Sequence, residues 1–165
     1  MRLNIEYSAK RVIAENFITE PPVPINTILG NYGIKSLEVD IDEAIAGLLD
    51  PDDKAVFVNK RDSIKKKTFT LAYELGHFLL HEKQISKDPD IAILYRKPIG
   101  SSEYSMVEKE AVTFAVSLLV PEAFLKDVIN KHGKVATAAV LSDVFGVTEE
   151  IVKYRMKELK LDKTE

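Results

Sequence analysis

Ionisable and metal-binding residue types are concentrated in one stretch, FTLAYELGHFLLHE, at positions 69–82. Apolar residues recur there at helical spacing and predict one amphipathic helix. At about 100° per residue, one face of this helix is apolar and carries Leu71, Leu75, Phe78 and Leu79. The opposite face is polar and carries Tyr73, Glu74, His77 and His81. We expect the apolar face to anchor the helix and the polar face to meet whatever the protein acts on.

The polar face has the spacing of a zinc-peptidase motif with one replacement. Residues 73–77, YELGH, match H-E-x-x-H except that Tyr73 stands in the first histidine position. In the intact motif two imidazoles bind zinc, a third ligand comes from elsewhere, and the glutamate takes a proton from metal-bound water. Glu74 keeps the place of that base and His77 the place of a ligand. Glu108, near the start of a later helix, is the predicted third ligand.

Other interpretations of the same residues remain open. His77 and His81 are themselves four residues apart and could hold a metal with Glu108. Alternatively, His77 is a core histidine hydrogen-bonded to Glu74 or Glu108, since a lone histidine seldom indicates a metal. Ser105 and Glu108 also fit the S-x-x-E capping box, which would direct the Glu108 side chain to the Ser105 amide.

The composition favours one domain over residues 1–165. The chain has 165 residues, 45% of them hydrophobic, and no cysteine, which excludes disulfides and thiolate zinc sites. We find no membrane span or signal-peptide pattern and expect a cytoplasmic protein. The net charge of -3 gives no overall attraction to nucleic acid. A local basic patch is expected to be a solvated loop and comprises Lys60, Arg61, Lys65, Lys66 and Lys67.

Local patterns predict an α+β fold in which a small antiparallel sheet packs on helices. The expected strands are 34–41, a hairpin of 47–49 and 55–59, and a short strand at 91–95. The expected helices are 5–18, 25–31, 69–82, 106–120, 122–131, 135–145 and 148–160. The polar stretch 83–105 is expected to be mostly loop and to act as a lid or substrate wall.

The last two helices also fit a helix-turn-helix pattern. Gly146 lies in the predicted turn, and Thr148 begins the helix that would read DNA. That helix opens with Glu149 and Glu150, which repel a polyanion. We therefore predict no specific nucleic-acid binding and treat 135–160 as part of the same unit.

Several segments together resemble the ImmA/IrrE family of metallopeptidases, which includes anti-repressor proteases of mobile elements and radiation-response proteases. They include FTLAYELGHFLLH, EKEAVTFAVSLLVP and the C-terminal VLSDVFGVTEEIVKYRMKEL. The resemblance implies zinc as cofactor, Glu74 as general base, and His77 and Glu108 as ligands. It places Tyr73 at the first histidine ligand and Val112 at an asparagine beside the site.

Both departures from the family pattern weaken metal binding. A neutral phenol at position 73 is a poor ligand, and valine at position 112 lacks the polar group expected beside the ligands. The resemblance implies a protein partner such as a helix-turn-helix repressor, with weakened or lost catalysis. A partner-binding module without catalysis is the alternative. We further expect Glu74, His77 and Glu108 to converge on one cleft, where an edge strand of the 47–59 hairpin would align an extended substrate.

Overall fold

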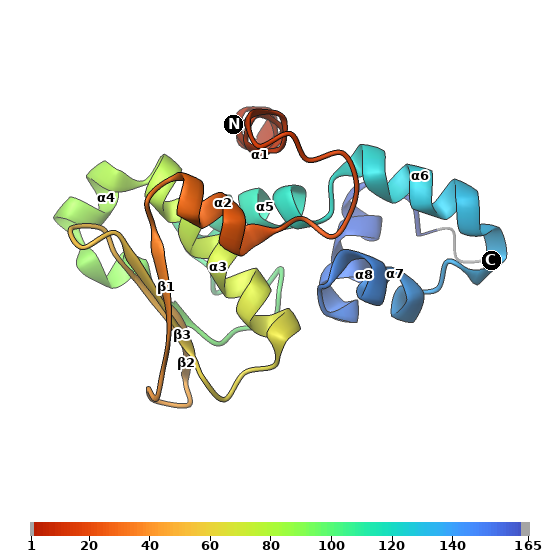
Figure 1. The fold of residues 1–165 in the computed structure, drawn as a ribbon. Coiled ribbons are helices and arrows are strands. Elements are labelled where there is room, and N and C mark those ends of the chain that lie inside the picture. Colours follow the sequence, from red (N-terminus) through yellow and green to blue (C-terminus); the bar gives the residue numbers. More distant parts are fainter. Residues whose placement is uncertain (1, 163–165) are drawn as a thin grey trace.

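The computed structural model describes residues 2–162, with side chains from residue 4 onward, and has the predicted α+β architecture (Figure 1). The outermost residues of the predicted unit, 1 and 163–165, lie outside the described part. The strands are β1 (Lys35–Val39), β2 (Ile45–Asp50), β3 (Ala55–Asn59) and β4 (Ile93–Tyr95). The helices are α1 (Arg2–Glu15), α2 (Ile25–Asn31), α3 (Ile64–Leu80), α4 (Glu82–Lys87), α5 (Met106–Leu119), α6 (Glu122–His132), α7 (Ala138–Phe145) and α8 (Glu149–Glu158). Short 3-10 turns occupy Pro89–Ala92 and Gly133–Val135. None of the helices in residues 2–162 is both long and apolar enough to cross a membrane.

The four strands form one mixed sheet in the order β1-β3-β2-β4. The predicted hairpin is confirmed, because β2 and β3 pair antiparallel with Leu48 opposite Phe57. The sheet is not wholly antiparallel, however, since β1 runs parallel to β3 with Leu37 opposite Phe57. Pairing of β1 with β3 and of β4 with β2 leaves both hairpin strands inside the sheet. The prediction that a hairpin strand offers a free edge to substrate is therefore wrong, and within residues 2–162 the edge strands of the sheet are β1 and β4.

Helix α3 lies between the sheet and α5 and is the centre of the core (Figure 1). Its contact with α5 is close because Gly76 has no side chain. A Cβ at Gly76 would lie 2.9 Å from Cδ1 of Phe114, which is completely buried. Helix α1 packs on α5 and covers it from outside. The core thus fixes α3 and α5 relative to each other, and these two helices carry the predicted site residues except His81, which directly follows α3.

Helix α3 begins five residues before the predicted start. The Ser63 side chain accepts a hydrogen bond from the backbone N–H of Lys66, which caps the helix. The helix therefore contains Lys65, Lys66 and Lys67, so the loop prediction is wrong for these three residues, whereas Lys60 and Arg61 lie in the turn before the helix. Most of its charges are paired: Lys60 and Arg61 with Asp40, Lys65 with Asp143, and Lys67 with Glu38.

The polar stretch after α3 is more ordered than the loop that the sequence predicts. Helix α4 and a 3-10 turn precede β4, which falls inside the predicted strand 91–95. Ile85 and Ala92 are buried and attach this region to the core, although the surrounding residues are polar. Isolated apolar residues in a polar stretch give no periodicity, and this is why the sequence pattern missed α4.

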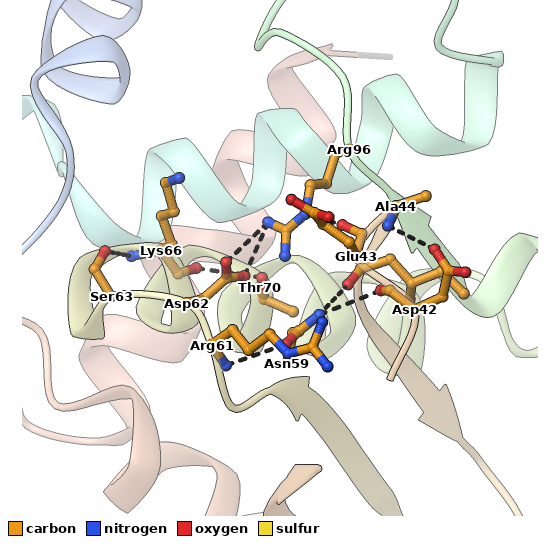
Figure 2. Close-up of polar contacts among 11 residues, drawn as sticks. Asp42, Glu43, Ala44, Asn59, Arg61, Asp62, Ser63, Lys66, Thr70 and Arg96 are labelled. Atoms are coloured by element: carbon orange, nitrogen blue, oxygen red, sulfur yellow. Dashed lines mark hydrogen bonds and ion pairs between the residues drawn. The ribbon is translucent and has the colours of Figure 1, made fainter. Parts of the chain in front are cut away.

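A polar network holds the connections around the N-terminal end of α3 (Figure 2). The buried amide of Asn59 donates to the backbone oxygens of Asp42 and Ile45. The Arg96 guanidinium lies 2.9 Å from the Asp62 carboxylate and also donates to the backbone oxygen of Glu43. These contacts join the segments that follow β1, β3 and β4, so the start of α3 and the end of β4 are held together.

The C-terminal helices form the predicted turn and contact the rest of the chain. Gly146 ends α7 in the left-handed conformation, as expected of a glycine at that position. In α8 the buried Arg155 donates to the backbone oxygen of Val120 and pairs with Glu6 of α1 and with Glu158. A buried guanidinium needs such partners, so α8 is anchored to the ends of α1 and α5.

Candidate functional site

The polar face of α3 is buried. Tyr73, Glu74 and His77 are each 0% exposed, and His81 is 1% exposed. The sequence pattern predicts a polar face that meets a partner, but α5 covers it in the structure. Helical periodicity shows which residues share a face and cannot show that a second helix packs on that face.

Along this face the rings of Tyr73, His77 and His81 follow one another at the spacing of one helical turn. The Tyr73 and His77 ring centroids lie 4.7 Å apart in an edge-on arrangement. The His77 and His81 centroids lie 4.9 Å apart. Phe69 begins the row, 6.2 Å from Tyr73. Tyr73 thus occupies the place next to His77 in which an intact motif has a second imidazole.

A chain of hydrogen bonds determines which nitrogen of His77 is free. Nε2 of His81 lies 2.9 Å from a carboxylate oxygen of Glu110, and Nδ1 of His81 lies 3.0 Å from Nδ1 of His77. A carboxylate only accepts, so His81 donates from Nε2; when neutral, His81 then accepts at Nδ1 from the Nδ1–H of His77. His77 Nε2 is left as a lone pair with no hydrogen-bond partner among the described residues. Sequence reasoning missed Glu110, because the contact depends on how α3 and α5 cross.

Two further polar groups of the site have no hydrogen-bond partner in residues 2–162. One is the carboxyl group of Glu74, in which neither oxygen has a partner, and the other is the hydroxyl of Tyr73. Burial raises the pKa of Glu74 well above its usual value. Burial, followed by the charge of Glu74, likewise raises the pKa of Tyr73. Both groups therefore favour their neutral forms, and a protonated carboxyl cannot act as a base.

His77 is also held neutral. Burial, reinforced by His81, lowers the pKa of His77 to about 3, and the nearby negative charge of Glu108 only partly opposes this. A neutral imidazole with a free Nε2 is able to bind a metal ion. The geometry therefore keeps one ligand atom available at His77.

Glu108 is already engaged by other groups. The predicted capping box is present: Ser105 N–H donates to Glu108 Oε2 at 2.7 Å, and Ser105 Oγ accepts from the Glu108 backbone N–H. Lys97 Nζ lies 2.8 Å from Glu108 Oε1. Partial burial raises the pKa of Glu108, but hydrogen bonds from Lys97 and Ser105 outweigh it and hold that pKa below its usual value. Glu108 is thus an ionised carboxylate with both oxygens used.

These residues do not fit a catalytic zinc ion. Within residues 2–162 no three histidine, aspartate or glutamate side chains are close enough together to hold a metal. His77 offers a free nitrogen, but Tyr73 offers a protonated phenol, and Glu108 is paired with Lys97. The assignment of His77, Glu108 and the substitute His81 as ligands, and of Glu74 as base, stays a prediction.

A cleft of about 400 Å³ lies beside the buried row. It is lined by Phe69 and Thr70 of α3, by Lys97 and Ile99 of the segment after β4, and by Glu150 of α8. Neither Glu74 nor His77 lines it, and Glu108 reaches its wall only through Lys97. The three predicted site residues therefore do not meet at this opening.

The buried carboxyl of Glu74 predicts a specific pH dependence of stability. Its pKa in the folded protein lies above the unfolded value of 4.5, so the folded state keeps a proton that the unfolded state releases. Stability is then lost as the pH rises from about 4.5, at up to about 1.4 kcal/mol per pH unit for one proton. Glu74→Gln removes this loss, and we expect the variant to be more stable than the parent at pH 8 but not at pH 4.

Urea unfolding of both proteins between pH 4 and pH 8, in EDTA, measures this difference. The exposed Glu20→Gln is the matched control and is expected to unfold like the parent at every pH. Protonation of His77 in the acid range changes the stability of both proteins equally, so its contribution cancels when the two stabilities are compared. A constant difference between Glu74→Gln and the parent over this range would show that Glu74 is ionised in the folded protein.

The class of protein follows from comparison with family models, because the IrrE N-terminal-like domain, a peptidase family, matches residues 31–157. The chain belongs to this family. No curated protein matches the chain.

Among solved structures, a Mycobacterium tuberculosis transcriptional regulator has a similar fold, with a TM-score of 0.64 and 18% sequence identity. The similarity covers 93% of this chain and 46% of the regulator. This chain therefore spans less than half the length of that protein, and at such identity the likeness concerns the fold alone.

Proposed function

We propose that this chain is a metallopeptidase-like protein that acts on a regulatory protein partner, such as a helix-turn-helix repressor, with weakened or lost catalysis. The observation that carries the proposal is the state of the buried row. Tyr73 replaces a ligand, Glu74 favours its protonated form, and Glu108 is paired with Lys97. Zinc, the metal expected for the family, would find His77 as its one free ligand nitrogen.

Two findings support a protein partner concerned with transcription. A protein of similar fold is itself a transcriptional regulator and has a further part that this chain does not match. The cleft beside α3 has apolar lining residues that include Phe69 and Leu94, and polar lining residues that include Lys66, Arg96 and Glu150. Such a mixed surface suits a peptide segment of a partner. With such a partner, the proposed place of action is the cytoplasm.

The proposal is tested with the purified full chain and a panel of purified helix-turn-helix repressors. Binding is followed by calorimetry and repressor integrity by mass spectrometry, each with added zinc chloride and with EDTA. We expect binding that EDTA leaves unchanged and a repressor that stays intact. Zinc-dependent cleavage would contradict the loss of catalysis. Absence of binding to all of the repressors in the panel would contradict the proposed class of partner.

A DNA-binding function is the second candidate, because α7, Gly146 and α8 have helix-turn-helix character. The first turn of α8 speaks against it. Glu149 and Glu150 open the helix, and Glu150 accepts a hydrogen bond from the backbone N–H of Ile99, 3.0 Å away. The end that would enter the major groove is thus acidic and packed against the segment after β4.

We therefore expect no sequence-specific duplex binding at physiological salt. A mobility-shift selection from random duplex DNA tests this expectation, and Glu149→Lys/Glu150→Lys serves as a comparison in which non-specific binding should increase. Enrichment of one sequence by the parent protein would favour the DNA-binding function instead.

A further inference from the structure

Lys97 occupies a defined place next to the predicted ligand Glu108. The residue before it is fixed, because Arg96 N–H donates to the backbone oxygen of Ala44 and the Arg96 guanidinium pairs with Asp62 (Figure 2). The backbone oxygen of Lys97 accepts from the hydroxyl of Tyr104 at 3.3 Å. Contacts on both sides thus hold the Lys97 backbone in place.

The Lys97 ammonium is partly enclosed together with its partner. The Lys97 and Glu108 side chains are 19% and 14% exposed, and their charged atoms lie 2.8 Å apart. The ammonium also lies 4.9 Å from the centre of the Tyr104 ring, which favours a cation. A partly buried pair with this geometry is stronger than an exposed ion pair.

The pairing leaves no carboxylate oxygen of Glu108 free. Lys97 takes Oε1, and the backbone N–H of Ser105 takes Oε2. A metal ion at Oε1 of Glu108 would have to displace the ammonium, and a metal ion at Oε2 would compete with the Ser105 N–H and be repelled by the nearby ammonium. The charge of Glu108 nevertheless contributes to the raised pKa of Tyr73 and partly opposes the lowered pKa of His77.

We propose that Lys97 is an internal cation that takes the place of a metal ion at Glu108 and competes with divalent metal for that carboxylate. This inference rests on the proposed function, because it explains the degenerate site by a second residue besides Tyr73. Tyr73 replaces the first histidine ligand, and Lys97 pairs with Glu108, the predicted third ligand. Replacing the lysine by an uncharged side chain should release Glu108.

The test measures zinc affinity in Tyr73→His and in Tyr73→His/Lys97→Met, by titration of the full chain with zinc chloride against a competing chelator. We expect the double variant to bind zinc at least ten times more tightly than Tyr73→His. Tyr73→His/Lys97→Arg keeps the charge and should bind like Tyr73→His. If Lys97→Met does not fold, Lys97→Gln provides the same loss of charge with a polar side chain.

Tyr73→His/Lys67→Met is the matched control. Lys67 is 15% exposed and pairs with Glu38 at 3.0 Å, so its removal also deletes a half-buried ion pair, but one away from Glu108. An equal gain in zinc affinity in this control would show that loss of any nearby positive charge is sufficient, and it would overturn the proposal. Equal zinc affinity with and without Lys97, or no zinc binding by Tyr73→His/Lys97→Met, would also overturn it. Repressor binding by the parent protein is measured separately, so failure of the proposed function is distinguished from failure of this inference.

Discussion

Tyr73→His is expected to bind zinc at least about ten times more tightly than the parent protein, a gain of about 1.4 kcal/mol or more. Catalytic zinc sites have three protein ligands, and the parent has only His77 and Glu108 in predicted ligand positions. A histidine at 73 would stand one helical turn from His77 and complete the pair of imidazoles. His77 already has a free Nε2, so it needs no rearrangement.

The structure also indicates that the exchange is sterically acceptable. Tyr73 is completely buried and its hydroxyl has no hydrogen-bond partner among the described residues, so the smaller imidazole fits the same space without breaking a hydrogen bond. Burial keeps Tyr73 protonated, which explains why the phenol is a poor substitute ligand. We expect the gain in affinity to come from the new nitrogen atom and not from a change of fold.

Zinc titration of both proteins, with repressor cleavage followed alongside, measures the effect. Phe69→His is the matched control, because it adds an imidazole to the same row one turn further from His77 and should gain nothing. Tight zinc binding and cleavage by the parent, with no gain in Tyr73→His, would make Tyr73 or His81 a true ligand. The interpretation of the site as degenerate would then be wrong.

The largest expected loss of stability follows from Gly47→Ala. Gly47 lies in β2 where α3 crosses the sheet, and an added Cβ would lie 2.4 Å from Cγ2 of Thr70 and 2.6 Å from the backbone oxygen of Phe57. The Phe57 oxygen belongs to the neighbouring strand β3 and cannot move without breaking the sheet. We expect a loss of about 3 kcal/mol of unfolding free energy, and a fall in Tm of roughly 10 °C.

Gly30→Ala is the matched control for this substitution. Gly30 lies inside α2 with no atom within 4 Å of its added Cβ, so alanine should stabilise that helix. The expected gain is about 0.5–1 kcal/mol. Thermal and urea unfolding of both variants measure the pair, and an undiminished Tm in Gly47→Ala would show that α3 can move away from the sheet at little cost.

Local sequence patterns determined the elements whose signals lie within a few residues. The glycine stop at Gly146 and the β2–β3 hairpin were predicted and are confirmed, and the Ser105–Glu108 capping box, which the sequence offered as an alternative to a ligand at Glu108, is present. Each depends on contacts between close neighbours in the chain, such as a side chain with a backbone amide three residues away. Residue spacing also placed Tyr73, Glu74 and His77 on one face of α3, because the helical repeat is a local property.

Only the tertiary structure decided what those faces meet. Packing of α5 on α3 buries the polar row, joins His81 to Glu110, and brings Lys97 to Glu108. Pairing of β1 with β3 and of β4 with β2 encloses the hairpin strands that were expected to offer an edge. These contacts join residues distant in sequence, and they are set by how helices cross and strands are ordered. The sequence alone therefore determined which residues share one face of α3, whereas packing determined that this face is buried and that Lys97 pairs with Glu108.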